Sequence, residues 1–376
     1  MTGLPLSLLV SAALAAWVGL AFVPALIEAA RRRMATPLPV ADSYQEDLRL
    51  GPFALASRVR DPEELGRALQ NVRRHAQSAL VPMENDRHAL VLAPGTAIPR
   101  EAGTEAIVLT ASWTEGEEDG AVFASPIVVM GEVHLPPRTR LAGLYAQSLL
   151  ALGPEATVDR WLYVEGDALI GRGAMLTGTA TATETLSIGP DSTFERISGW
   201  LVRAGRPGEA RTRPQPRRSQ STSSFEPPGH TRTGFGRLFC DGDLEIPESV
   251  RVEQDLVATG SVRVGAGAVV LGSIKGRGAV EVGEGAFVQG AVFSEEDVTI
   301  GEGAHIGGAT VAEGHLSLGA EAEVGTAARP TTASGRSVEL ALGAGVHGTV
   351  WALEHGVVAA ADSPFRGAEL SNKLAV

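Results

Sequence analysis

An 18-residue repeat is the feature that most restricts how this chain can fold. Five units follow one another without slippage between residues 244 and 324, and the same columns hold aliphatic residues in each unit. The central column is Ile246, Val264, Val282, Ile300 and Leu318, and the next residue is Pro in the first unit and Gly in the other four. So many columns kept at one period indicate a repeat architecture.

The period also predicts the shape of one unit. Apolar and polar residues alternate within it, as in strands with one buried face. Three short strands with Gly at the corners make a triangular coil of this length, and stacked coils pair as parallel strands about 4.8 Å apart. The narrow interior suits Val, Ile, Leu and Ala, which agrees with an aromatic content of only 5%. We therefore predict an all-β fold, a parallel β-solenoid.

The same spacing occurs earlier in the chain and sets the expected domain plan. Leu152, Ile170 and Ile188 follow one another at the same period, and Gly follows each of them. We expect a first β-helical part at 125–205 and a second at 238–356, separated by a disordered basic insertion at 206–237. A tail at 357–376 follows. Residues 31–124 are expected to hold a tether, one amphipathic helix from about residue 61 and several short strands.

The amino terminus is predicted to be a transmembrane helix, residues 1–30. No charged residue occurs before Glu28, and the apolar run from Leu4 to Ile27 is long enough to cross a bilayer. Arg31, Arg32 and Arg33 follow directly, which favours a cytoplasmic position for everything after them. The expected location is the inner (cytoplasmic) membrane, with a single span and the C-terminal body in the cytoplasm.

The insertion differs in composition from the rest of the chain. Residues 203–237 hold eight Arg, two Glu and five Pro, in a protein whose formal net charge is −12. Arg211, Arg213, Arg217 and Arg218 are therefore candidates for contact with anionic lipid head groups, together with Arg31, Arg32 and Arg33. Contact of these arginines with a partner protein, with the chain's own acidic surface or with a nucleic acid stays open. The acidic overall balance gives no support to nucleic-acid binding.

Motifs for catalysis, cofactors and metals are scarce. The single cysteine, Cys240, excludes a disulfide framework and a cysteine-based metal site. No phosphate-binding loop and no zinc-protease motif occurs. Asp241, Asp243 and Glu245 are interpreted as a charged turn. His305 is the best-placed candidate for a general base, in the manner of hexapeptide-repeat acyltransferases, but the hexad pattern fails at Gly276, Ser294 and Ala312. We expect no catalytic residue, no cofactor and no metal.

Two stretches resemble the bactofilin family of bacterial polymer-forming cytoskeletal proteins. They are Cys240-Asp241-Gly242-Asp243-Leu244-Glu245-Ile246 and the run Val282-Gly283-Glu284-Gly285-Ala286-Phe287-Val288. The resemblance covers 238–325 well and 125–200 loosely. It implies a right-handed β-helix that joins end to end without nucleotide and scaffolds envelope or morphogenetic proteins. The membrane span, the long amino-terminal region and the basic insertion depart from the family pattern.

These observations lead to one functional expectation and two alternatives. We expect a membrane-anchored structural protein that self-associates or scaffolds envelope or cytoskeletal partners. The first alternative is a membrane-tethered binding module that does not polymerise, because capping segments can close the ends of a solenoid. The second is a hexapeptide-repeat acyltransferase.

Overall fold

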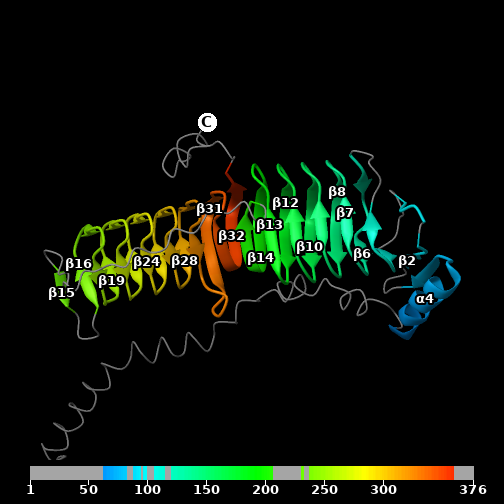
Figure 1. Ribbon diagram of the computed structural model, residues 1–376, viewed down its shortest axis with the longest axis horizontal. Helices are drawn as coiled ribbons and strands as arrows, with labels where there is room; N and C mark the ends of the chain where they lie inside the picture. The colour runs from blue at the N-terminus through cyan, green and yellow to red at the C-terminus, as the bar shows by residue number, and fades with distance from the viewer. Residues whose placement is uncertain are drawn as a thin grey trace, which may run out of the picture. The chain divides into compact units, whose positions relative to one another are not determined.

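The computed structural model of the chain is drawn in Figure 1 and describes residues 62–82, 88–94, 96–99, 106–114, 120–205, 230–232 and 237–359. The chain divides into two compact units, Met1–Leu50 and Gly51–Val376, and every described residue belongs to the second. The helix predicted for residues 1–30 lies outside the described residues. Within the described ranges, no helix is long and apolar enough to span a membrane.

The described body is a parallel β-solenoid of about 13 coils, which confirms the predicted fold class. Its carboxyl-terminal half, the second stack, repeats at the predicted period: Val262 pairs with Val280, and Val280 with Val298. The strands of the second stack are β16 (Leu238–Cys240), β17 (Leu244–Ile246), β18 (Arg251–Val252), β19 (Leu256–Ala258), β20 (Val262–Val264), β21 (Val269–Val270), β22 (Ile274–Gly276), β23 (Val280–Val282), β24 (Phe287–Val288), β25 (Val292–Ser294), β26 (Val298–Ile300), β27 (His305–Ile306), β28 (Thr310–Ala312), β29 (His315–Leu318), β30 (Glu323–Val324), β31 (Thr331–Leu340) and β32 (Gly345–Val358).

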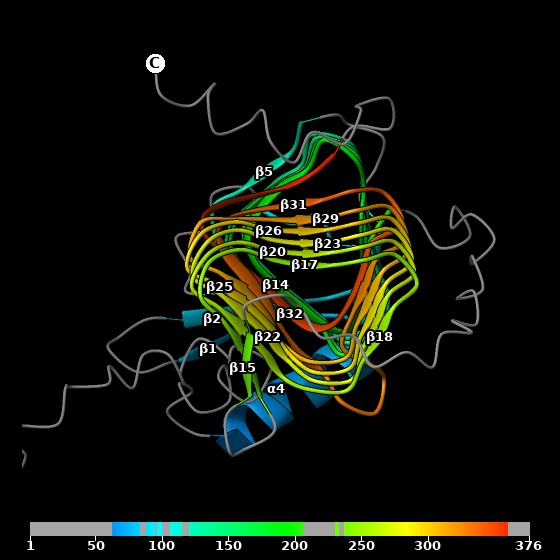
Figure 2. The same ribbon diagram turned by 90° about the vertical axis from the view of Figure 1, so that its left-hand side faces the viewer.

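The coils have three sides, which the view along the stack in Figure 2 shows. Face A carries β17, β20, β23, β26 and β29; face B carries β18, β21, β24, β27 and β30; face C carries β16, β19, β22, β25 and β28. In each three-residue strand of faces A and C the first and third residues are buried and the middle one points outward. The alternation seen in the sequence therefore fills the core with small aliphatic side chains.

The amino-terminal half, the first stack, begins before residue 125, the expected start. Its parallel ladder starts at β2, where Leu92 pairs with Leu109 and Leu109 with Val129. The first of these steps is shorter than the repeat and the second is longer, so the repeat was not visible there. The strands are β2 (His88–Leu92), β3 (Ala106–Leu109), β4 (Trp113–Thr114), β5 (Val122–Phe123), β6 (Ile127–Val129), β7 (Val133–Leu135), β8 (Arg140–Ala146), β9 (Leu150–Leu152), β10 (Thr157–Val164), β11 (Ala168–Ile170), β12 (Met175–Ala182), β13 (Thr185–Ile188) and β14 (Thr193–Ala204).

The core of the first stack is wide enough for aromatic rings, contrary to the expectation of a purely aliphatic interior. Trp113 and Phe123 are buried there with ring centroids 5.2 Å apart in an edge-to-face arrangement. Phe194 in β14 is also buried. Such pairs add specific ring contacts to the burial of their area.

The two stacks meet at their carboxyl-terminal ends. Strand β14, the last of the first stack, pairs antiparallel with β32, the last of the second, with Ile197 opposite Val350 and Ser198 opposite Thr349. The second stack thus starts at its far end and winds back toward the first, as the colours in Figure 1 show. Each stack covers the last open edge of the other, so neither leaves these backbone groups unpaired.

One sheet consequently runs through both stacks along face C, and an antiparallel strand closes it at each end. Strand β1 (Ala79–Pro82) pairs antiparallel with β2, and β15 (His230–Arg232) with β16. The order is β1, β2, β3, β6, β8, β10, β12, β14, β32, β31, β28, β25, β22, β19, β16 and β15. The two outer ends of face C therefore carry no free parallel strand edge.

The first coil of the second stack has a further feature that opposes stacking. In later coils the glycine after the central column donates its N–H to the coil before, as Gly265 does to Ile246 and Gly283 to Val264. Pro247 holds this place in the first coil, and proline has no N–H to donate. A further coil stacked against this first coil would therefore not receive this hydrogen bond on face A.

The predicted amphipathic helix is present as α4 (Pro62–His75) and packs on the body. Its Leu65 and Val72 are buried against the outward side of the first coils, where Val108, Val128 and Tyr145 lie. These contacts form a second apolar core outside the solenoid. A surface position on a membrane, which the sequence also allowed, would leave this face without its cover.

The register after Leu318 differs from the expected one. Leu318 pairs with Leu340, so this coil is four residues longer than the repeat. In the structure the extra residues lie before β31, where Thr326 and Arg329 form an isolated bridge.

One corner of most coils requires a left-handed backbone. Gly267, Gly285 and Gly303 have φ near 60°, and the same corner in other coils is occupied by Glu155 (φ 59°) and Glu321 (φ 54°). A side chain with a Cβ costs about 1–2 kcal/mol in this conformation. The solenoid therefore holds strain at its non-glycine corners.

We expect Gly285→Ala to destabilise the protein and Glu155→Gly to stabilise it, each by about 1 kcal/mol. A Cβ at Gly285 would meet no atom within 4 Å, so the cost of the substitution comes only from holding a residue with a Cβ at positive φ. Thermal unfolding of the full chain measures both. The matched control is Gly66→Ala in α4, where the same change favours the helix. A midpoint that is unchanged for Gly285→Ala would contradict the strain assignment.

Candidate interaction surface

The arginines singled out in the sequence lie outside the described residues. These are Arg31, Arg32 and Arg33 after the predicted span, and Arg211, Arg213, Arg217 and Arg218 in the insertion. Their contact with lipid or partners stays a prediction. The described surface consists of the three outer faces, and each carries a different set of side chains.

Face A is charged and its side chains pair with one another. The outward column begins with Glu245, Arg263 and Glu281, and the Arg263 Nε lies 2.8 Å from a Glu281 carboxylate oxygen. The hydrogen bond to Glu281, and then its charge, raise the pKa of Arg263 above the usual value. Both groups are exposed to solvent, so the pair contributes little to stability. Its two charged groups make the outside of face A hydrophilic.

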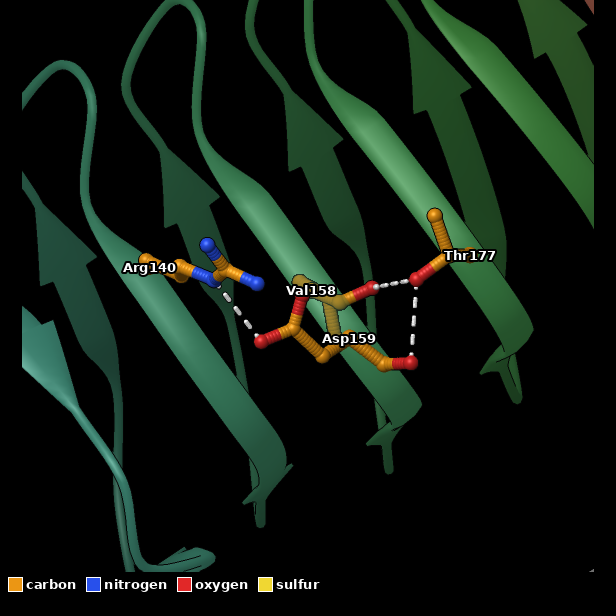
Figure 3. Close-up of polar contacts among 4 residues, drawn as sticks. All are labelled: Arg140, Val158, Asp159 and Thr177. Carbon is orange, nitrogen blue, oxygen red and sulfur yellow. Dashed lines mark hydrogen bonds and ion pairs between the residues drawn. The ribbon is translucent and has the colours of Figure 1, made fainter.

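The first stack has comparable ladders between coils, one of which Figure 3 shows. Arg140 donates through Nε to a carboxylate oxygen of Asp159 at 2.9 Å. Thr177, one coil further, donates its hydroxyl to the Asp159 carbonyl at 2.9 Å and lies 3.3 Å from that of Val158. Strand pairing is interrupted between Val158 and Trp161, so side chains supply part of the contact between coils there.

The acidic cluster of Asp241, Asp243 and Glu245 lies at a corner of the coil, where the two aspartates bond to the next coil. Asp243 accepts the backbone N–H of Ser261, one coil later, at 2.8 Å, and Asp241 accepts the hydroxyl of Thr259 at 2.9 Å. The same bond recurs at three other corners: Asp167 to Thr185, Asp255 to Ser273 and Asp297 to His315. Within the described ranges, no group of three or more His, Cys, Asp or Glu side chains is suited to hold a metal ion.

Face B holds His305, the residue considered for catalysis. Its ring stacks on Phe287 with centroids 5.4 Å apart, and its Nδ1 lies 3.6 Å from Glu323. The predicted column is confirmed, since Val269, Phe287, His305 and Glu323 follow in register. The geometry gives His305 a packing role on an outer face, with a carboxylate beside it.

His315, near the junction, is largely buried. Its side chain is 16% exposed, its Nδ1 lies 2.8 Å from the Ser337 hydroxyl, and its Nε2 is 3.7 Å from Glu339, which is itself buried. The last distance is too long for a hydrogen bond. The cluster joins the coil of β29 to that of β31 on face A near the junction. The longer coil after Leu318 places Glu339 beside Ser317. The 18-residue pattern of the sequence does not show this neighbour.

Face C of the second stack is apolar on its outside. In register along it lie the outward residues Phe239, Val257, Lys275, Phe293, Val311, Ser334 and Trp351. We call these seven residues the stripe. Lys275 lies over the Phe293 ring, 4.9 Å from its centroid. The stripe was not recognised from the sequence, where single outward positions, each a full coil from the next, do not stand out.

The junction exposes further large apolar side chains. Trp351 is 39% exposed with Arg196 over its ring, and Leu353 is 70% exposed. Trp200 is 48% exposed and packs edge-on against His347. Trp200 and Trp351 lie on the outer surface and do not cover an open end of the core, because β14 and β32 cover each other's edges.

Comparison with known proteins gives no assignment. No family model matches the chain, and neither a curated protein nor a solved structure matches it significantly.

We expect Asp243→Ala to lower the thermal midpoint by the equivalent of about 1 kcal/mol, because Ser261 loses its acceptor. The control is Glu245→Ala two residues away, an exposed side chain in the adjoining strand β17, which should leave the midpoint unchanged. Addition of Ca²⁺ should change neither value. A Ca²⁺-dependent stabilisation that Asp243→Ala abolishes would show that the corner binds a cation after all.

Proposed function

We propose that this protein is a membrane-anchored, non-enzymatic structural protein, whose solenoid acts as a scaffold and self-associates through its side. Residues 1–30 hold the body at the inner membrane, and the body lies in the cytoplasm. The partners are the lipid bilayer, other copies of the chain, and envelope or morphogenesis proteins. The bactofilin-like columns of residues 238–325 support this reading.

The observation that carries the proposal is the architecture of the outer faces. Their polar side chains bond mainly to the neighbouring coil, as Arg263 does to Glu281 and Asp243 to Ser261. These bonds hold neighbouring coils together, and the result is a long, regular surface. An extended rigid surface of this kind suits the display of binding sites, as in other repeat proteins.

The ends of the described body favour limited association over end-to-end filaments. An open filament needs a free, complementary surface at each end of the subunit. Here β1 and β15 close face C, the carboxyl-terminal ends of both stacks are paired at β14 and β32, and Pro247 lacks the donor that another coil would need. The alternative of a tethered module that does not polymerise is supported by the same features.

Membrane anchoring is tested by fractionation of the full chain and of a variant without residues 1–30. We expect the full chain to stay with membranes after a high-salt wash and the shortened chain to be soluble. For orientation, Cys240→Ser with Glu281→Cys should react with an impermeant maleimide only after the inner membrane is opened. A full chain found in the soluble fraction would refute the anchor.

End-to-end growth is tested by negative-stain electron microscopy of the purified full chain without nucleotide. We expect small discrete particles at physiological salt, because both outer ends are closed on face C and Pro247 lacks a donor on face A. Long single filaments would show that the capping strands do not prevent stacking. In that case growth does not require the N–H that Pro247→Gly would restore. An end-to-end polymer of the bactofilin type would then be the better proposal than a closed scaffold.

A further inference from the structure

The stripe on face C is unlike the corresponding column on face A. Five of its seven members are Phe, Val or Trp, whereas the face A column contains Glu245, Arg263, Glu281 and Glu339. In the second stack, the column beside the stripe consists largely of small side chains, among them Ser273, Ala291 and Ala309. Face C is therefore an apolar strip with charged residues, among them Arg277, Glu295 and Glu313, along one margin. Contiguous apolar strips of this kind mark interaction sites.

The same face is already covered by protein in the first stack. The sheet of face C continues through β14 into β12, β10 and β8, and α4 with β1 packs on the outward side of its first strands. Tyr145 and Val128 there are buried by this cover. Beyond the junction the face continues with Trp351 exposed. Between this covered patch and the stripe the outward residues of face C are polar, among them Thr179, Thr181 and Arg196, so the stripe is a separate, uncovered strip on the same sheet.

We propose that a second copy of this chain docks on the stripe, face to face, with the order of its coils reversed. The inference rests on the proposed function and names its contact surface. The two-fold axis lies in the plane of the contact, along the strand direction, at the coil of Phe293. Phe293 then meets its own counterpart, and Phe239 at one end meets Trp351 of the partner at the other.

The charged margin of the stripe fits this arrangement. Arg277 and Glu313 occupy equivalent corner positions, one coil before and one coil after that of Phe293. A reversed copy places Arg277 opposite Glu313 of the partner, and Glu313 opposite Arg277. Within the described part of the chain neither side chain forms an ion pair, and both are exposed. Glu295, between them, faces Glu295 of the partner at the axis, and Lys275 of its own copy, 3.8 Å away, offsets the repulsion of this like-charged pair.

The size of the stripe predicts a weak contact that the membrane strengthens. Seven strands at about 4.8 Å span roughly 29 Å, and a strip of this length that is one strand wide is smaller than a specific interface of about 800 Å² per partner. Copies held in one membrane plane meet at a high effective concentration, so a contact that is weak in solution forms there. A lateral contact also leaves the closed ends undisturbed.

Cross-linking of the full chain in native membranes tests the proposal. In a Cys240→Ser background, Glu295→Cys places a thiol at the two-fold axis without altering the stripe. A short bismaleimide should convert it to a covalent dimer several-fold more than Glu281→Cys, an exposed glutamate position on face A. Adding Val311→Asp should reduce the Glu295→Cys dimer to the level of the control, since an unpaired charge is placed in the contact.

The orientation is tested by exchange of charges in the Glu295→Cys chain. Arg277→Glu alone and Glu313→Arg alone should each lower the cross-linked fraction, and the double variant should restore it. Restoration excludes a merely structural effect of either residue. Equal cross-linking at Glu295→Cys and Glu281→Cys, or no rescue by the double variant, overturns the proposal.

Failure of this inference is distinguishable from failure of the proposed function. If Glu295→Cys gives no dimer but is protected from a monofunctional maleimide in membranes, another occupant covers face C and the second copy is refuted. Membrane fractionation is independent of the stripe, so Val311→Asp should still fractionate with the membrane. Loss of the anchor would instead refute the proposed function.

Discussion

The constraint on which the rest of the structure depends is the parallel pairing of each strand with its equivalent in the next coil. Once Val262 lies beside Val280, every outward and inward position of one coil is stacked on its equivalent in the next. The inward positions therefore form columns of similar aliphatic residues along the body, and the outward positions form columns of mixed composition. Columns of Val and Ile make the core, while the Asp at the corner caps a backbone N–H of the following coil. The outer faces inherit the same order, and this makes one face charged and another apolar.

The sequence was sufficient to predict the solenoid because the inward columns are chemically uniform. It predicted α4 as well, since Leu65, Leu69 and Val72 recur at helical spacing. The first coils were missed because their unequal lengths break the period. The antiparallel junction could not be predicted. Nothing in the local pattern of β14 or β32 says that their open edges belong together, since that pairing depends on where the insertion returns the chain.

The candidate surface was less accessible from the sequence than the fold. Outward residues are free to vary, so Phe239, Val257 and Phe293 carry no periodic signal of their own. They become a surface only when register places them side by side. His315 illustrates the same limit, since four extra residues in the coil after Leu318 bring Glu339 beside Ser317 and near the imidazole. The arginines chosen from composition lie in segments that the structure does not describe.

The antiparallel junction also has a consequence for synthesis of the protein on the ribosome. Ile197 and its partner Val350 are far apart in the sequence, so β14 is translated long before the strand that covers it. The first stack, whose contacts are mostly between neighbouring coils, can fold as it emerges. Its final edge then waits, unpaired, until the second stack has been completed from the opposite end. Chaperone binding, or pairing between two nascent chains on one polysome, would be concentrated at this edge and in this interval.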